Sequence, residues 1–265
     1  MSVPGLTCFL RLKPCGFRAC TDGANGIDRV EMFIRNSMNT AKPNQFMNDF
    51  LELRKSVAIY GHLNLISQVL LKITPPGVPD FYQGTELWNF SPVDPDNRRR
   101  VDFDKCVRLL EEIKTREVSA LEDLLTDLVS NWHDGRIKLY LRRKALNFRS
   151  AHKDLFGSEE YIPLEMTGQR RDRVVAFARR RRREWAIVAV PRLIAELLRS
   201  QKSAQRRSAF PALRVMLPAE FPDAWKNVVT EGAVVARPAA DGHKTLSLSK
   251  MLECFPAILL APCEE

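Results

Sequence analysis

The first part of the chain carries apolar residues at helical spacing. Between residues 28 and 71 they recur three and four positions apart, which predicts two or three amphipathic helices. Similar runs from Val107 to Ile113 and from Leu121 to Leu128 predict two more, with Asp104 as the N-cap of the first. A further helix is predicted over Ile137 to Phe148. This part of the chain is therefore expected to be mainly helical.

After Gly157 the period changes from that of a helix to that of a strand. Short apolar or alternating runs, separated by turn residues, lie at residues 161–166, 174–178, 185–190, 213–217, 226–229 and 257–260. This spacing is typical of an antiparallel β-sandwich. A short helix is expected from Ile194 to Leu198, and Trp185 and Trp225 are expected in the core.

A short apolar run from Ile73 to Tyr82 separates these helical segments, and three prolines and a glycine interrupt it. We interpret it as a buried strand that opens into a loop at its carboxyl end. That end is where α/β barrels place their functional residues. The segment is therefore predicted to lead into a functional site.

The loop that follows combines aromatic rings with carboxylate, amide and guanidinium groups. Such planar groups can hydrogen-bond neighbouring hydroxyls in pairs, and rings can cover the apolar face of a sugar. The residues concerned are Tyr82, Gln83, Glu86, Trp88, Asp94, Asp96, Asn97, Arg98 and Arg99. Their chemistry predicts a sugar-binding loop.

Two motifs in this region, GVPDFYQGTELW and DPDNRRRVDF, resemble the end of the catalytic barrel in the maltooligosyltrehalose synthases, which are members of the α-amylase superfamily. The resemblance extends over most of the chain. It includes residues 29–39, 60–74, 132–146, 172–180 and 185–193, in the same order.

This resemblance implies an α/β plus all-β fold: the C-terminal end of a (β/α)8 barrel with associated helices, followed by an antiparallel β-sandwich domain. It divides the chain into an unmatched N-terminal segment at 1–27, a partial catalytic-barrel and helical region at 28–157, and a C-terminal β-sandwich domain at 158–265.

In the intact family the implied reaction is an intramolecular transglucosylation of maltooligosaccharides, which turns the reducing-end α-1,4 linkage into an α,α-1,1 (trehalose) linkage. Retaining chemistry of this kind uses two closely spaced carboxylates. The family's motifs for these acids lie upstream of any segment present here, so we expect no catalytic residue in this chain. No metal or organic cofactor is implied. The alternative is a non-catalytic remnant, or a glucan-binding fragment of a broken gene.

Asp94 and Arg98 are the main substrate candidates. The resemblance implies that they hydrogen-bond a glucose unit, whereas the alternative is a salt bridge inside a turn, because Asp and Asn favour turn positions. Asn97 and Arg99 are weaker candidates for glucan contact, and they could instead order the loop.

Tyr82, Gln83 and Glu86 follow the predicted strand and are candidates for stacking or polar contact with the glucan. The alternative is that Tyr82 and Trp88 are core residues at the barrel rim.

The positive charge of the chain is concentrated in one part of the sequence. The net charge of +9 arises between Arg136 and Arg207, where twenty Lys and Arg residues face seven Asp and Glu. The run from Arg179 to Arg183 is predicted to be a solvated hairpin turn, with a phosphate-binding patch as the alternative. No aromatic residues interleave the run, which argues against single-stranded nucleic acid as a partner.

The remaining features argue against several classes of protein. The six cysteines form no CxxC pair, so a zinc site is not expected; the trio Cys8, Cys15 and Cys20 lies in the unmatched segment. Residues 1–20 do not form a signal peptide, and no apolar run reaches the ~18 residues of a membrane span. We expect a cytoplasmic protein whose partner is a maltooligosaccharide, with no nucleic-acid or membrane partner; the sequence leaves its oligomeric state open.

Overall fold

The computed structural model describes residues 24–41, 43–92, 94–157, 160–195, 210–239 and 242–263. The chain divides into two compact units. The first unit comprises residues up to 59 and residues 91–99, and the second unit comprises residues 60–90 and those from 100 onward. The short helix predicted from Ile194 to Leu198 lies mostly outside the described residues.

The first unit is helical, as the apolar spacing predicts. It contains α2 (Ala24–Ser37), the N-terminal part of α3 (Gln45–Ile73) and the short helix η1 (Asp96–Arg98). Asn44 joins the two long helices: its Nδ2 donates to Ser37 O (2.8 Å), and its Oδ1 accepts from Met47 N (3.2 Å). One amide thus satisfies a carbonyl at the end of α2 and a free N–H at the start of α3.

The strand predicted from Ile73 to Tyr82 is not formed. Ile73 ends α3, where the hydroxyl of Thr74 donates to Leu70 O (2.8 Å), and turns and irregular backbone follow. Val78, expected to be buried, is 94% exposed. A strand needs a hydrogen-bonded neighbour, and none of the strands in the described ranges pairs with this segment. The apolar run is divided between a helix end and a loop.

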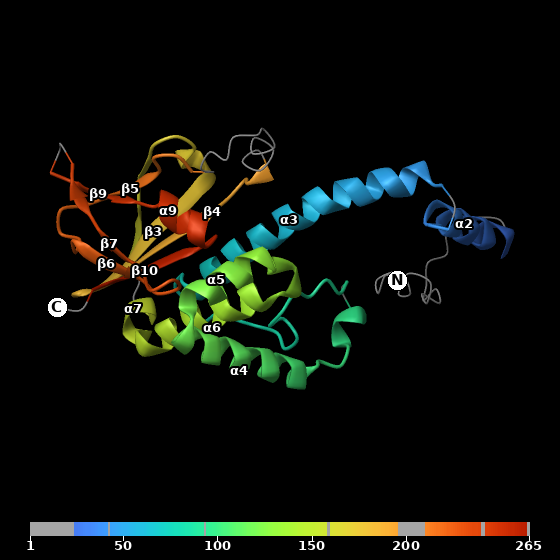
Figure 1. Ribbon diagram of the computed structural model, residues 1–265, viewed down its shortest axis with the longest axis horizontal. Helices are drawn as coiled ribbons and strands as arrows, with labels where there is room; N and C mark the ends of the chain where they lie inside the picture. Colours follow the sequence, from blue (N-terminus) through green and yellow to red (C-terminus); the bar gives the residue numbers. More distant parts are fainter. Residues whose placement is uncertain are drawn as a thin grey trace. The chain divides into compact units, whose positions relative to one another are not determined.

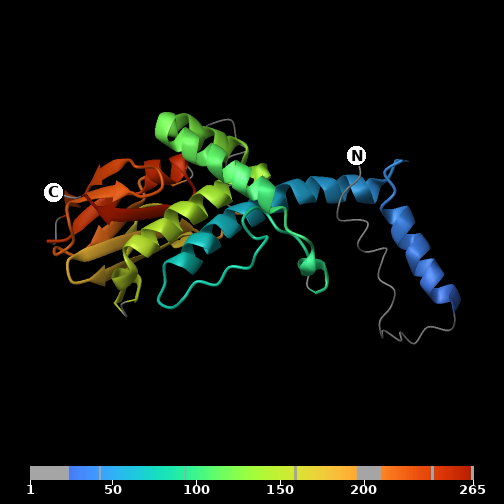
Figure 2. The ribbon, with the colours of Figure 1, turned by 90° about the horizontal axis from the view of Figure 1, so that it is seen from below.

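The helices predicted in the second unit are confirmed. They are α4 (Phe103–Ser119), α5 (Leu121–Ser130) and α6 (Arg136–Ala151). The short helices η2 (Trp132–Asp134), before α6, and α7 (Lys153–Gly157), after it, were not predicted. These helices lie on one side of the strands in Figure 1, and Figure 2 shows α6 beside the C-terminal part of α3. The predicted N-cap was wrong by two residues: the side chain of Asp102, not Asp104, accepts from Lys105 N (2.9 Å).

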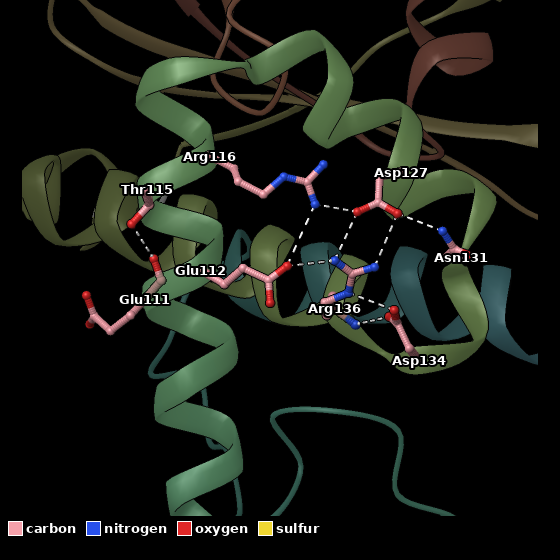
Figure 3. A network of polar contacts seen from close by, with 8 residues as sticks. All are labelled: Glu111, Glu112, Thr115, Arg116, Asp127, Asn131, Asp134 and Arg136. Carbon is pink, nitrogen blue, oxygen red and sulfur yellow. Dashed lines mark hydrogen bonds and ion pairs between the residues drawn. The ribbon is translucent and has the colours of Figure 1, made fainter.

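A network of charged side chains fastens α4, α5 and α6 together (Figure 3). Asp127 on α5 accepts from Arg116 of α4 (2.5 Å) and from Arg136 of α6 (2.9 Å). These hydrogen bonds, that from Arg116 first, hold the pKa of Asp127 well below its usual range. Arg136 also reaches Asp134 (2.7 Å) and Glu112 (3.3 Å). The network fixes the start of α6, which in turn holds the candidate loop.

Two antiparallel sheets form the predicted sandwich. The six-stranded sheet has the order β1-β3-β4-β10-β6-β7 and the four-stranded sheet the order β2-β5-β9-β8. The strands are β1 (Tyr161–Pro163), β2 (Met166–Thr167), β3 (Val174–Arg181), β4 (Glu184–Pro191), β5 (Arg214–Leu217), β6 (Ala224–Asn227), β7 (Ala233–Val235), β8 (Arg237–Pro238), β9 (Lys244–Ser247) and β10 (Ile258–Pro262). Strands β7 to β9, the helix α9 (Ser249–Cys254) and η3 (Arg171–Arg173) were not predicted, because runs this short carry little periodicity.

The six-stranded sheet has a core on each face. On β4, Trp185 and Ile187 belong to the cluster between the two sheets, whereas Val188 and Val190 belong to the cluster that includes α4, α5 and α6. Trp185 and Trp225 are 5% and 0% exposed, so their predicted core positions are confirmed. The helices and the sandwich therefore share a core, and the domain boundary at residue 157 stays a prediction.

The end of the arginine run forms the predicted hairpin turn, whereas its first three residues belong to β3. Arg181 pairs with Glu184 at the end of the β3–β4 ladder, so that Arg182 and Arg183 make the turn. Arg179 is an exception to the predicted solvation, because it is fully buried. Its side chain donates to the carbonyls of Glu160 (3.2 Å), Thr74 (3.3 Å) and Phe156 (3.4 Å), among other contacts. The strand's inward pleat buries this arginine beneath the ends of α3 and α7.

Candidate functional site

The predicted sugar-binding residues are divided between the two units. Asp94, Asn97, Arg98 and Arg99 lie in the first unit, and Tyr82, Gln83 and Glu86 lie in the second. The two groups therefore have separate surroundings.

In the first unit, Asp94 and Arg98 face each other across the turn that contains η1. Arg98 donates through Nε to Oδ1 (3.2 Å) and through an Nη to Oδ2 (2.6 Å) of Asp94. The side chains are 73% exposed for Arg98 and 55% for Asp94. Arg99 pairs likewise with Asp96 (3.1 Å), and Asn97 is exposed. This is the bidentate geometry of a turn salt bridge, and exposure leaves both groups accessible to hydroxyls; their role as glucan ligands stays a prediction.

In the second unit, Tyr82 is 68% exposed and Gln83 is exposed as well. The alternative of a core position is therefore wrong for Tyr82. Trp88 is half-buried: its indole Nε1 donates to Trp132 O (2.7 Å), and its ring lies edge-on to that of His62 at 4.5 Å. Tyr82 thus presents an open ring, whereas Trp88 is packed.

Glu86 is more enclosed than the other candidates. Its side chain is 22% exposed, and it forms an ion pair with Arg142 of α6 (3.5 Å). Its second oxygen, Oε2, is buried without a hydrogen-bond partner among the described residues. The guanidinium of Arg142 also lies over the ring of Phe81, 4.4 Å from its centroid. Glu86 is therefore tied to α6 and does not face solvent as the turn pair does.

The helix α6 positions the whole segment between Ile73 and Trp88. At its C-terminal end, Arg149 donates to Ile73 O (2.5 Å), Pro75 O (3.2 Å) and Gly77 O. At its start, Gly135 has a φ of +86°, and a Cβ there would lie 3.0 Å from Trp88 N. Side chains of α6 thus donate hydrogen bonds to backbone carbonyls of the candidate loop, as the N–H groups of a neighbouring strand would in a sheet.

Lys138 is a residue that the sequence analysis missed. It is 8% exposed, and its Nζ donates to Leu87 O (3.0 Å). Burial, followed by the charges of Arg142 and Lys72, lowers the pKa of Lys138 to about 8, although Glu86 opposes the shift. A lysine within a helical apolar pattern usually points to solvent, so the sequence carried no signal for this position.

The described residues give no indication of a metal site or of a membrane span. No group of three or more His, Cys, Asp or Glu side chains in these ranges could hold a metal ion. Cys106, Cys254 and Cys263 are free thiols, whereas Cys8, Cys15 and Cys20 lie outside the described part. In the same ranges, no helix is both long and apolar enough to cross a membrane.

Comparison with known proteins places these observations in context. No protein-family model matches the sequence. A protein of Mycobacterium tuberculosis assigned as a maltooligosyl trehalose synthase, from each of two strains, is 35% identical over 143 residues. The match covers 51% of this chain and 15% of the relative, so the chain spans only a small part of the curated relatives that it matches.

Solved structures give the same result for the fold. The maltooligosyltrehalose synthase of Arthrobacter ramosus has a TM-score of 0.65 at 22% identity, over 89% of this chain and 26% of that protein. The DSM5389 glycosyltrehalose synthase has a TM-score of 0.56 at 22% identity, over 89% and 25%. The chain is therefore similar to a portion of the maltooligosyltrehalose synthases, as its loop motifs indicate.

Proposed function

We propose that this chain corresponds to the C-terminal portion of a maltooligosyltrehalose synthase, and that it contacts an α-1,4-glucan and braces a catalytic barrel. The sequence similarity over 143 residues supports the proposal most directly. The motif GVPDFYQGTELW, whose Leu87 and Gly77 carbonyls accept hydrogen bonds from Lys138 and Arg149 of α6, adds to that support. In this reading, α3 and α6 are late helices of a (β/α)8 barrel, and the sandwich is the domain that follows it.

The intact enzyme would convert the reducing-end α-1,4 linkage of a maltooligosaccharide into an α,α-1,1 linkage by intramolecular transglucosylation. Retention needs a nucleophile and an acid/base carboxylate about 5 Å apart. The loop acids of this chain have other partners: Asp94 is paired with Arg98, and Glu86 with Arg142. We infer that this chain holds no catalytic carboxylate and that its role is binding.

The candidate glucan contacts are of two kinds. The exposed turn offers carboxylate, amide and guanidinium groups, and the loop before it offers an open ring and an amide. The proposed ligands are Asp94, Arg98, Asn97, Arg99, Tyr82, Gln83 and Glu86. Asp94 and Arg98 already hold each other in position through their ion pair. Little side-chain entropy is therefore lost when their exposed polar atoms hydrogen-bond the hydroxyls of a sugar.

The alternative is a non-catalytic remnant or glucan-binding fragment of a broken gene. The observation that favours it is the apolar surface of the first unit, where Phe33, Phe46, Leu53 and Val57 are each more than half exposed. Apolar surface of this kind promotes association unless another chain or segment covers it.

The test is incubation of the purified chain with maltohexaose, with product analysis and a binding measurement in parallel. We expect binding, but neither a non-reducing product nor hydrolysis. A non-reducing product that disappears in Glu86→Ala or Asp94→Ala would contradict the assignment of a binding role. Absence of binding would favour the remnant instead.

A further inference from the structure

The second unit contains a groove beside Tyr82 and Lys138. It has a volume of about 440 Å³, and the C-terminal part of α3, residues 80–85 and the start of α6 line it. Volumes of this size are typical of small-molecule sites. Its polar lining consists of Gln68, Lys72, Asp80, Thr85 and Lys138, with the ring of Tyr82 beside them.

Lys138 gives this groove its chemical character. The side chain carries three N–H donors, and Leu87 O is the one acceptor within hydrogen-bond distance in the described part of the chain. The residue as a whole is 8% exposed, and its side chain lines the groove, so the remaining two donors are available to a ligand there. Its partners among the described residues are this one carbonyl and the ring of Trp88, whose centroid lies 5.7 Å from Nζ, and an ammonium with a single acceptor is costly to bury. The cost would fall if a ligand in the groove accepted hydrogen bonds from Lys138.

The other side chains provide the complementary groups. Lys72 lies with its Nζ 4.8 Å from the centroid of the Phe81 ring, so it is held at the edge of the groove by a cation–π contact. Asp80 supplies a carboxylate acceptor, and Tyr82, 68% exposed, offers an uncovered aromatic face. Donors, an acceptor and an open ring therefore meet around one cavity.

This combination fits a neutral polyhydroxyl ligand better than an anion. A sugar hydroxyl both accepts from an ammonium and donates to a carboxylate, and the apolar face of the pyranose can stack on an aromatic ring. A phosphate would accept from the two lysines, but the carboxylate of Asp80 would repel it. The lining therefore suits hydroxyls, which use both its donors and its acceptor, and phosphate is the competing ligand because two lysines face one carboxylate.

We propose that the groove between α3, residues 80–85 and α6 is a glucosyl-binding subsite in which Lys138 and Lys72 donate to sugar hydroxyls and Asp80 accepts from them. The inference rests on the proposed function, because its ligand is the same α-1,4-glucan. It adds Lys72 and Lys138, which lie outside the loop motifs, and Asp80, which lies within the first motif. It also makes the start of α6 part of the binding surface as well as a support for the loop.

The test is calorimetric titration of the folded chain with maltohexaose, for wild type, Lys138→Met and Lys72→Met. The matched control is Lys114→Met, which removes an exposed lysine of α4 that pairs with Glu111. We expect each groove variant to bind about tenfold more weakly, because a charge-assisted hydrogen bond is lost, and the control to bind like wild type. Circular dichroism establishes whether each variant is folded. Lys72 is exposed, so Lys72→Met still tests the subsite if Lys138→Met does not fold.

The outcomes separate this inference from the proposed function. If wild type binds maltohexaose and both groove variants bind it equally well, the subsite is refuted, whereas the proposed glucan contact stands. If wild type binds no glucan, both fail. A parallel titration with inorganic phosphate distinguishes the ligand classes: phosphate binding that depends on Lys138 and competes with maltohexaose would show an anion site and overturn the proposal.

Discussion

Replacement of Lys138 by methionine should change the stability of the chain in a way that depends on pH. Methionine has a similar length and no charge, so it fills the same space and removes the buried ammonium. The variant also loses the hydrogen bond to Leu87 O. Because that loss hardly varies with pH, the pH dependence isolates the contribution of the charge.

The size of the effect follows from the pKa. Burial lowers the pKa of Lys138 from 10.5 to about 8 in the folded chain. The unfolded chain therefore binds more protons between these values, and the stability of wild type rises with pH across this window. A difference of 2.5 pH units corresponds to about 3 kcal/mol in all, of which about 2–3 kcal/mol is recovered between pH 7 and pH 10.

The assay is urea denaturation of wild type, Lys138→Met and the control Lys114→Met at pH 7 and at pH 10. The free energy of unfolding of Lys138→Met, relative to wild type, should be higher at pH 7 than at pH 10 by about 2–3 kcal/mol. The control should show no such change. Equal differences at the two pH values would show that Lys138 titrates as an ordinary lysine, so that its ammonium carries no burial cost for a ligand to relieve.

Three further predictions concern the other contacts. Asp127→Ala should lower the free energy of unfolding by about 1–3 kcal/mol at pH 7, because Arg116 and Arg136 lose the carboxylate that they share. Because the pKa of Asp127 is lowered in the folded chain, the difference from wild type should shrink as the pH falls toward 3, and urea curves at the two pH values check this. Asp94→Ala and Arg98→Ala should each change the free energy of unfolding by less than about 1 kcal/mol, because the pair is exposed, and should weaken maltohexaose binding about tenfold. Unchanged binding together with a lower melting temperature would show that the pair only stabilises the turn. Arg179→Met should cost about 1–3 kcal/mol, because the buried carbonyls of Thr74, Leu155 and Phe156 lose a donor. Chemical denaturation measures the loss, and a wild-type midpoint would refute the role of Arg179 as an anchor.

The sequence by itself determined the regular elements and their order. Helical spacing predicted α4, α5 and α6, and the change of period after Gly157 predicted the sandwich. Each of these elements buries one side, so its apolar residues repeat with the period of a helix or of a strand. The motifs in the loop were sufficient to indicate the family that comparison with known proteins also finds. Residue order also placed Asp94 and Arg98 four positions apart, close enough for a turn pair.

Only the tertiary structure decided the features that depend on contacts between residues distant in the sequence. The run from Ile73 to Tyr82 has the composition of a strand, but no strand of the described ranges pairs with it. Ile73 ends α3, and Arg149 of α6 holds the first part of the loop that follows. Arg179 and Lys138 are basic residues that a sequence places at the surface, and both are buried, because carbonyls distant in the chain accept their hydrogen bonds. Charge and hydropathy are properties of one residue, whereas burial and pKa depend on neighbours that folding brings together from distant positions.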